Sequence, residues 1–427
     1  MSQRLLRIVE AGDIPSIRRD PVDQTTLDEA GAIVDDVRRR GATAIRHHGE
    51  RLGDIEGDEA LVVESSELRD ALESLDSTRR EVLERTAERI DKFARAQRGS
   101  LSAMEMPIPG GVAGHRVIPV DRAGCYAPGG RFPLPSSVLM TAVTARAAGV
   151  REIWLASPRP TVETLAAAAI AGVDGVLRVG GAQAIAGLAF GFDDVPGCDA
   201  LVGPGNRWVT AAKQLVSGFV RIDMLAGPSE LVVLADDTAN PEIVAADLLA
   251  QAEHDPDALP ILVSTSRRLA DAVERELAKQ LDVLTTKDTA SAALMGGFVV
   301  IVDDLDVAVD VCNRLAPEHL EVLTEEADQV AQKLRHFGGL FVGENAAEVL
   351  GDYGAGPNHT LPTGGTARSQ GGLSVFDFLK IATWMRIDDR KEAAALVEDA
   401  VSLAEMEGLD GHGRSAAARL VGQDCDD

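Results

Sequence analysis

The sequence predicts an α/β fold with two domains and mostly parallel sheets, with a helical N-terminal segment and a helical C-terminal tail. From residue 115 onward, short β-branched runs alternate with Ala-rich helical stretches, which is the pattern of βαβ units. The runs are too many for one sheet of ordinary size, so we expect two sheets. Before residue 115 the pattern is helical instead.

The helical N-terminal pattern covers residues 25–97, where apolar residues such as Ile33, Val34 and Val37 recur at helical spacing among many charges. Helices are also expected over 376–384 and 391–407. Strands are expected at 116–120, 152–156, 175–179, 201–202, 220–222, 230–234, 260–263, 297–302, 320–323 and 340–342.

These elements divide the chain into four parts. Residues 1–20 are an N-terminal segment, and residues 121–229 form one α/β domain. We expect the flanking segments, 21–120 and 230–373, to close on each other as a discontinuous α/β domain. Residues 374–427 form a helical tail that is too short to fold alone and must pack on something else.

The charge balance excludes several functions. Lys and Arg total 42 against 68 Asp and Glu, which gives the 427-residue chain a net charge of −26. Such a surface repels nucleic acid and anionic lipid, so neither is an expected partner. Only seven of the 42 cations are lysine. An acidic, Lys-poor surface indicates a halophilic protein, because high salt screens the repulsion between its charges. An acidic mesophilic enzyme is the alternative.

The cysteines and the apolar runs indicate a cytoplasmic protein. Cys125, Cys198, Cys312 and Cys425 show no metal-binding or disulfide spacing, which is typical of a reducing compartment. The N-terminus lacks the apolar stretch of a signal peptide. The longest apolar run, 165–173, is too short to span a membrane.

The stretch 222–254 looks like part of a site. It reads IDMLAGPSE, continues as an apolar strand, and ends in a helix with the sequence DLLAQAEH. Gln251 and His254 are three residues apart and share one helix face. An amide oxygen and an imidazole nitrogen at this spacing can bind one divalent ion. A polar helix end with a capping histidine is the alternative interpretation.

A second motif, APEH at 316–319, places a carboxylate beside an imidazole at a loop–strand junction. Glu318 and His319 can then supply two proton-transfer groups to one site. Adjacent strand residues point to opposite faces, so this requires Glu318 to remain in the loop. An ordinary surface glutamate beside a hydrogen-bonded histidine is the alternative.

Histidines concentrate in these motifs. The Gly-rich loop 351–365 contains Asp352 and His359, and EGLDGH at 407–412 ends in His412. Loops of this length in compact domains are usually functional. Four of the eight histidines therefore fall in motifs with other polar groups, which favours a shared site.

Three Gly-rich turns lie in or beside the 121–229 domain, at 123–130, 179–184 and 202–206. Each follows an expected strand and precedes a helix N-terminus, where backbone N–H groups attract phosphate. None has the full G-x-G-x-x-G pattern. A nucleotide or another phosphate ligand is expected here, with ordinary turns as the alternative.

Together these motifs resemble the histidinol dehydrogenase family, in its order and over residues 124–412. The resemblance implies two incomplete Rossmann-like domains and a zinc-dependent, NAD-linked oxidation of L-histidinol to L-histidine through L-histidinal, the final step of histidine biosynthesis. It also implies a homodimer whose exchanged C-terminal tail completes the partner's site.

The resemblance also assigns the site residues. Glu318 and His319 match the catalytic pair, with neutral His319 taking the alcohol proton and Glu318 activating water. The metal ligands match Gln251, His254, Asp352 and His412. Substrate contacts match Ser229, His319, His359 and Glu407 together with the four metal ligands, and NAD contacts match Tyr126, Gln183 and Asn206.

Other functions remain open at this point. A metal-dependent hydrolase would leave the Gly-rich turns unexplained, a related amino alcohol could replace histidinol, and a non-enzymatic binding protein would need no metal. A nucleophilic role for Cys125 or Cys312 is disfavoured because no base accompanies either in its motif. Arg207 and Trp208 depart from the family, which more often has an apolar residue and Tyr there.

Overall fold

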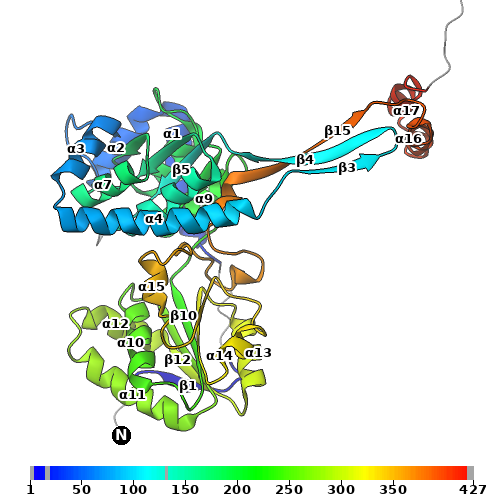
Figure 1. Ribbon diagram of the computed structural model, residues 1–427. Coiled ribbons are helices and arrows are strands. Elements are labelled where there is room, and N and C mark those ends of the chain that lie inside the picture. Colours follow the sequence, from blue (N-terminus) through cyan, green and yellow to red (C-terminus); the bar gives the residue numbers. More distant parts are fainter. Residues whose placement is uncertain (1–3, 15–19, 130–132, 421–427) are drawn as a thin grey trace, which may run out of the picture. The chain divides into compact units, whose positions relative to one another are not determined.

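The computed structural model describes residues 4–14, 20–129 and 133–420. It divides into two compact units: unit 1 comprises Met1–Gln97 and Val120–Phe378, and unit 2 comprises Arg98–Pro119 and Leu379–Asp427. Figure 1 shows the mixed α/β architecture, and the predicted fold class with mostly parallel sheets is confirmed. In the described part, no helix is long and apolar enough to cross a membrane.

Sheet A of unit 1 is wholly parallel, with the strand order β1-β12-β11-β10-β13-β14. Its strands are β1 (Arg7–Val9), β10 (Glu230–Ala235), β11 (Leu259–Ser264), β12 (Phe298–Ile301), β13 (His319–Leu323) and β14 (Gly339–Val342). The helices of this part are α10 (Pro241–Ala252), α11 (Arg267–Leu281), α12 (Lys287–Gly296), α13 (Leu305–Leu315), α14 (Ala327–Ala331) and α15 (Glu348–Asp352). The central strands are buried on both faces, which explains their continuous apolar sequences.

Sheet B of unit 1 has the order β2-β7-β6-β5-β8-β9 and is parallel except for β2. Its strands are β2 (Val62–Glu64), β5 (Arg122–Tyr126), β6 (Glu152–Ala156), β7 (Gly175–Leu177), β8 (Ala200–Val202) and β9 (Arg221–Ile222). The helices of this part are α1 (Gln24–Arg40), α2 (Ala42–Leu52), α3 (Ser65–Ser74), α5 (Pro135–Val138), the π-helix η1 (Leu139–Val143), α6 (Thr144–Ala148), α7 (Val162–Ile170), α8 (Gly181–Phe190) and α9 (Arg207–Val216).

The N-terminal helices belong with sheet B, not with sheet A as the sequence analysis expected for 21–120. Helix α1 packs against α8 and α9, and β2 pairs with β7. Ala30, Val34 and Val37 are buried in the same core as Leu201 and Val209. The helical pattern correctly indicated an apolar stripe, but a stripe does not specify which sheet it covers.

The described part of unit 1 has three further elements outside the sheets and the helices named above. They are the long helix α4 (Ser77–Gly99), whose last two residues belong to unit 2, and the 3₁₀ turns η2 (Thr366–Arg368) and η3 (Val375–Phe378). The N-terminal segment expected over 1–20 contributes β1, which pairs with β12 at the edge of sheet A.

Unit 2 contains sheet C, an antiparallel sheet of order β15-β4-β3, and two helices. Its elements are β3 (Met104–Ile108), β4 (Gly111–Pro119), β15 (Leu379–Ile387), α16 (Ala394–Met406) and α17 (Asp410–Ala417). The helix expected over 376–384 was wrong: residues 376–378 belong to η3, and residues 379–384 belong to β15, which pairs with β4 along all nine of its residues. Pairing with a distant strand overrode the local preference. The helix expected over 391–407 is confirmed by α16.

Candidate active site

Glu318 and His319 lie where β10 and β13 begin side by side. Leu231 of β10 pairs with His319, the first residue of β13, and Glu318 occupies the bend just before it. The Glu318 carboxylate therefore remains in the loop, as the proton-transfer hypothesis required. Its Oε2 accepts a hydrogen bond from the Glu230 backbone N–H at 2.9 Å. The Ser229 side chain also lies close enough to this carboxylate to lower its pKa.

The surroundings of His319 assign its two ring nitrogens different roles. Nδ1 lies 3.1 Å from the Glu230 carbonyl oxygen, an acceptor, so Nδ1 carries the proton. Nε2 is buried and has no hydrogen-bond partner; the nearest acidic oxygen is Oδ1 of Asp352, at 3.8 Å. The lone pair of Nε2 is therefore free to accept a proton.

Burial shifts the pKa values of both groups because it disfavours their charged forms. It lowers the pKa of His319 to about 3, so the ring is neutral at ordinary pH. It raises the pKa of Glu318 well above its usual value, and the carboxylates of Glu230 and Asp352 add to the effect. A carboxyl group with a raised pKa exchanges protons more readily near neutral pH than an exposed one.

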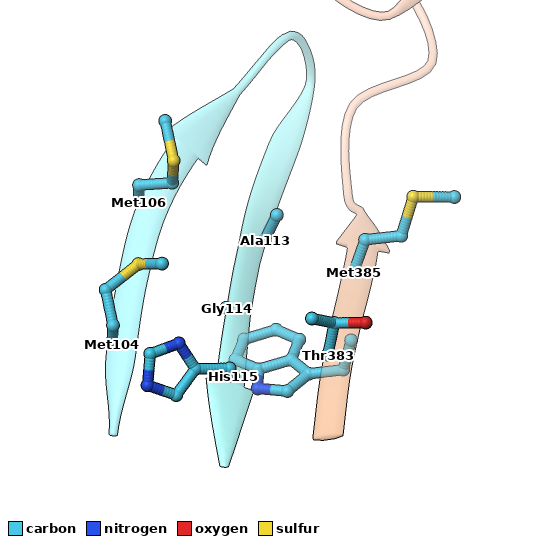
Figure 2. A pocket seen from close by; sticks show the side chains of 8 residues that line it. Met104, Met106, Ala113, Gly114, His115, Thr383 and Met385 are labelled. Atoms are coloured by element: carbon cyan, nitrogen blue, oxygen red, sulfur yellow. The ribbon is translucent and has the colours of Figure 1, made fainter. Parts of the chain in front are cut away.

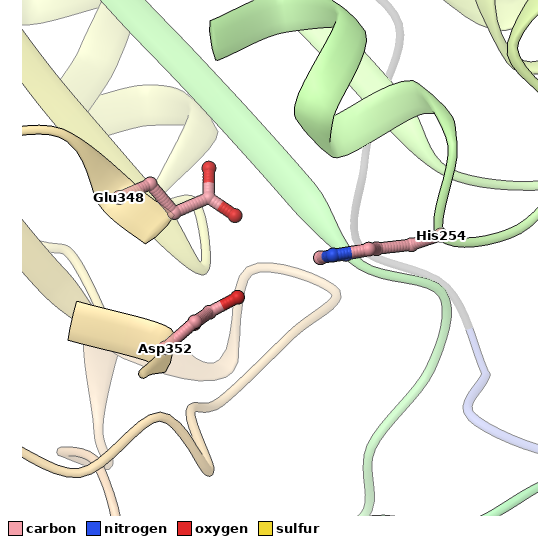
Figure 3. A group of neighbouring side chains, drawn as sticks. All are labelled: His254, Glu348 and Asp352. Atoms are coloured by element: carbon pink, nitrogen blue, oxygen red, sulfur yellow. The ribbon is translucent and has the colours of Figure 1, made fainter. Parts of the chain in front are cut away.

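A second group of side chains lies next to this pair. His254 follows the end of α10, while Glu348 and Asp352 begin and end α15, which contacts α10. Figure 3 shows the three side chains pointing toward one another, and their potential ligand atoms all lie within 4.8 Å. Glu348 is buried and His254 is exposed. Burial raises the pKa of Asp352 to about 6.

Gln251 tests whether this region suits a metal ion. It lies in the last turn of α10, is fully buried, and neither its amide oxygen nor its amide nitrogen has a hydrogen-bond partner. Burying an amide without partners is costly, so such a group usually serves a ligand. Gln251 stands three residues before His254 on the chain. Together with the imidazole and the two carboxylates of the cluster, its amide would complete a set of N/O donors that fits a divalent ion such as zinc.

Glu348 was missed by the sequence analysis, although a signal for it exists. It stands four residues before Asp352 on one short helix, the spacing at which side chains share a face. Glu348 lies three residues before the Gly-rich motif, which starts at Gly351.

His359 joins the same region through the backbone of Asp352. Its Nδ1 lies 3.0 Å from the Asp352 carbonyl oxygen, and its Nε2 lies 3.4 Å from Oγ of Ser137. Burial lowers the pKa of His359 to about 4, so this ring is also neutral near pH 7. The structure thus gathers several predicted site residues in unit 1, around Glu318 and Asp352.

Two predicted residues belong to unit 2. Glu407 follows the end of α16, and His412 lies in α17; both are exposed. Their place in the site remains a prediction.

The three predicted NAD contacts lie at the carboxyl edge of sheet B. Tyr126 ends β5, Gln183 is in the first turn of α8 after β7, and Asn206 caps α9 after β8. The chain adds β6 and β7 on one side of β5, then β8 and β9 on the other. The point between β5 and β8 is where open parallel sheets bind their ligands.

Backbone segments pack closely at this edge. The Gly181 N–H donates to the Tyr126 hydroxyl at 3.2 Å. A Cβ atom at Gly203, where φ is +118°, would lie 2.2 Å from the Tyr126 carbonyl oxygen, so this turn requires glycine. Gln183 is fully buried near the Asp54 carboxylate, and neither of its amide atoms has a partner at hydrogen-bonding geometry. These features fit a polar ligand such as a dinucleotide.

A buried ion pair holds the Gly203 turn. Lys213 of α9 and Asp223, just after β9, contact each other and are almost fully buried. Lys213 Nζ donates to the Gly203 carbonyl oxygen at 3.0 Å, and Asp223 Oδ2 accepts from the Gly203 N–H at 2.7 Å. Both backbone groups of Gly203 are therefore fixed by charged partners.

Arg207 and Trp208, the two residues at which the sequence departs from the family pattern, lie on the surface of α9. The Arg207 guanidinium lies 4.1 Å from the centre of the Trp208 ring, and Trp208 Nε1 donates to Glu29 of α1 at 3.2 Å. The side chain of Asn206 still caps the helix by accepting from the N–H groups of Trp208 and Val209.

The described cysteines do not have the character of nucleophiles. Cys125, Cys198 and Cys312 are free and buried. Burial raises the pKa of Cys125 to about 12 and raises that of Cys312 as well, so neither forms a thiolate at neutral pH. Cys425, and Gly130 at the end of the first Gly-rich turn, lie outside the described residues.

Comparison with known proteins gives consistent matches. The family model "Histidinol dehydrogenase" matches residues 17–420. The chain is 45% identical over 400 residues to histidinol dehydrogenase of Thermus thermophilus, covering 93% of this chain and 95% of that one. It is 42% identical over 435 residues to that of Ralstonia nicotianae, covering 98% of both. The crystal structure of histidinol dehydrogenase from Elizabethkingia anophelis superposes with a TM-score of 0.90 at 30% identity, covering 98% of this chain and 99% of that one.

Proposed function

The chain belongs to the histidinol dehydrogenase family and is an oxidoreductase, and we propose that it oxidises L-histidinol to L-histidine through L-histidinal, the last step of histidine biosynthesis. One observation carries the proposal. A neutral imidazole with a free Nε2 lies beside a buried carboxyl group and within 3.8 Å of a potential metal ligand.

His319 and Glu318 move the protons of the reaction. Nε2 of His319 accepts the proton of the substrate alcohol, while Nδ1 stays fixed on the Glu230 carbonyl oxygen. Glu318 then takes a proton from the water that adds to the aldehyde, and His319 assists the second oxidation. NAD, when bound, accepts the hydride in both oxidations.

Gln251, His254, Asp352 and His412 would hold a zinc ion. When bound, the ion supplies orientation and Lewis acidity, because Zn²⁺ has no redox chemistry of its own. The orphaned amide of Gln251 and the convergence of His254 and Asp352 support this assignment. In this proposal Ser229, His359 and Glu407 also contact the substrate, and Glu407 offsets the charge of its ammonium group.

Tyr126, Gln183 and Asn206 would contact NAD. The position of all three at the carboxyl edge of sheet B supports this assignment, as does the unpartnered amide of Gln183.

A second copy of the chain is the proposed partner. One face of sheet C is apolar and exposed: the exposed fractions are 43% for Met104, 51% for Met106, 50% for Ile381 and 72% for Met385. Figure 2 shows Met104, Met106 and Met385 among the side chains that line a pocket on this face. The pocket has a volume of about 450 Å³. Exposed apolar surface on an element this small favours a partner. We propose a homodimer in which the exchanged tail brings His412 to the partner's site.

Mixed dimers test the exchange. H319N and H412A are each expected to be nearly inactive as homodimers. If the tail is exchanged, co-expression gives mixed dimers with one intact site, and part of the activity returns. Activity that stays at the background of the two variants would show that each tail serves its own chain.

The setting of the enzyme is also a proposal. A reducing, cytoplasmic compartment suits the three described free thiols. The net charge of −26 supports a halophilic enzyme. In that case the melting temperature rises between low and molar KCl, and a constant or falling value would contradict it.

One assay tests the activity itself. The enzyme is incubated with NAD and either L-histidinol or related amino alcohols, with and without a chelator, and NADH absorbance is followed. We expect NADH with histidinol, its loss after chelation, and its return with Zn²⁺. No NADH with any substrate would refute the dehydrogenase, and NADH that persists after complete metal removal would refute the role of the metal. E318Q should release the aldehyde and form little histidine; undiminished histidine formation would contradict its role.

A further inference from the structure

Glu348 has no role in the function proposed above, yet it occupies the centre of the site. It is 2% exposed, and its backbone N–H donates to Oε1 of Glu321 at 2.9 Å, which fixes the start of α15. Oε1 of Glu348 lies 3.5 Å from Nδ1 of His319, and its Oε2 is buried without a hydrogen-bond partner.

The Glu348 carboxylate lies among the other potential ligands. Glu348, His254 and Asp352 have ligand atoms within 4.8 Å of one another, and Figure 3 shows both carboxylates turned toward the imidazole. Ligands of tetrahedral zinc, at bond lengths of about 2.1 Å, lie roughly 3.4 Å apart. Small side-chain rotations would therefore close the group around an ion. A buried carboxylate oxygen is costly unless a cation or a hydrogen bond satisfies it.

The site has more potential metal ligands than a catalytic zinc ion uses. Unit 1 alone offers four, namely Gln251, His254, Glu348 and Asp352, and their two carboxylates balance a divalent charge. His412 of unit 2 would be a fifth. Catalytic zinc sites use about three protein ligands and keep a position open for substrate. All five donors cannot hold the ion at once and still leave that position.

We propose that Glu348 is a ligand of the metal whenever His412 is not, so that unit 1 loads the ion by itself and His412 then displaces Glu348. This inference rests on the metal site proposed above. The released carboxylate stays beside Nδ1 of His319, where its charge favours the tautomer that leaves Nε2 free.

The simpler role for Glu348 is to orient His319 without touching the metal. The two roles differ in metal affinity. If Glu348 is a ligand, replacing it should weaken Zn²⁺ binding most in the H412A background. If Glu348 only orients His319, replacing it should leave the Zn²⁺ affinity unchanged, both in the wild type and in H412A.

The full-length chain tests this as wild type, H412A, E348Q and H412A/E348Q. Zn²⁺ affinity is measured by competition with a chromogenic chelator, and Co²⁺ is added as a probe whose visible spectrum reports the number of ligands. E325Q, which removes an exposed carboxylate, is the matched control for charge. E348D keeps a carboxylate and serves as a second variant if glutamine at this position disturbs folding. Urea unfolding in the presence of chelator measures the stability of each variant without metal.

We expect H412A to retain one ion and H412A/E348Q to bind it at least about tenfold more weakly. E348Q alone should weaken binding less than about threefold, and E325Q should not change it. The Co²⁺ spectra of H412A and of H412A/E348Q should differ. Equal affinity of H412A and the double variant, or no ion in H412A, would overturn the inference. No ion in the wild type would instead overturn the proposed metal site.

Discussion

Sheets A and B are connected in the same way but use opposite edges. Each sheet has an N-terminal strand at one edge, β2 in sheet B and β1 in sheet A. Among the other strands of sheet B, β6 and β7 follow on one side of β5, and β8 and β9 on the other. In sheet A, β11 and β12 follow on one side of β10, and β13 and β14 on the other. The proposed NAD residues lie at the carboxyl ends of the strands of sheet B, as parallel sheets usually place a ligand. Glu318 and His319 instead lie at the amino end of β13.

The residues at the carboxyl edge of sheet A explain the difference. Asp236, directly after β10, accepts from the Glu325 N–H at 2.9 Å, and Asp237 contacts both Ser266 and Arg268. At the carboxyl edge of sheet A the residues after β10 are therefore carboxylates, whereas the corresponding turn of sheet B contains Gly203. These carboxylates would repel a phosphate. Strand connectivity shows where a crevice can form, and local side chains decide which edge is used.

The largest effect should come from the amino edge of sheet A. H319N removes the proton acceptor, so we expect kcat to fall by about 10²- to 10⁴-fold with little change in the KM for NAD. S266A, at the carboxyl edge of the same sheet, should change kcat less than about twofold. Steady-state kinetics of NADH formation measures both. A comparable loss in S266A would mean that both edges of sheet A serve the reaction.

Glycines with positive φ provide the next comparison. At Gly203 the φ of +118° and a Cβ position 2.2 Å from the Tyr126 carbonyl oxygen both oppose a side chain. At Gly343, after β14, φ is +85° and nothing lies within 4 Å of the Cβ position. G203A should therefore raise the KM for NAD about tenfold or more and lower the melting temperature. G343A should cost only backbone strain of about 1 kcal/mol, without affecting KM. Equal effects would show that strain alone matters.

A smaller effect is expected from the hydroxyl group of Tyr126. Y126F removes the acceptor for the Gly181 N–H, a hydrogen bond with a net contribution of about 0.5–1.5 kcal/mol. We expect the KM for NAD to rise about threefold to tenfold while kcat stays nearly constant. An unchanged KM, determined by varying NAD at saturating histidinol, would remove Tyr126 from the cofactor site.

The last comparison concerns the pH dependence of stability near β13, not the reaction. Burial and the neighbouring Asp247 raise the pKa of Glu321 from 4.5 to about 8. The folded state therefore keeps a proton that the unfolded state releases above pH 4.5, so stability falls as pH rises through this window. E321Q cannot lose that proton. Urea unfolding in chelator should show E321Q gaining stability relative to wild type between about pH 5 and pH 8. A difference that is constant with pH would contradict the shift.

The sequence located most strands but not their partners. Alternation of apolar runs and helices identified 152–156 as a strand, and the structure has β6 at these residues. The same reasoning misplaced α1 and missed β15, because helix packing and antiparallel pairing depend on residues far away in the chain. Local patterns contain no information about such partners.

For the site, short-range spacing was the more useful signal. The loop position of Glu318 followed from the Ala–Pro break before it, and the structure confirms it. The approach of Asp352 to His254 joins motifs about a hundred residues apart, and only the resemblance suggested it. Glu348 was missed because no motif includes it and because its importance comes from a buried, unsatisfied oxygen, which a sequence cannot reveal.

The Lys213–Asp223 pair has a consequence for how the cofactor binds. Both charges lie inside the part of unit 1 that contains sheet B and grip the N–H and the carbonyl oxygen of Gly203. The shape of this turn is thus fixed by side chains of the protein itself. A dinucleotide that binds there would lose little chain entropy, which favours its affinity for the site.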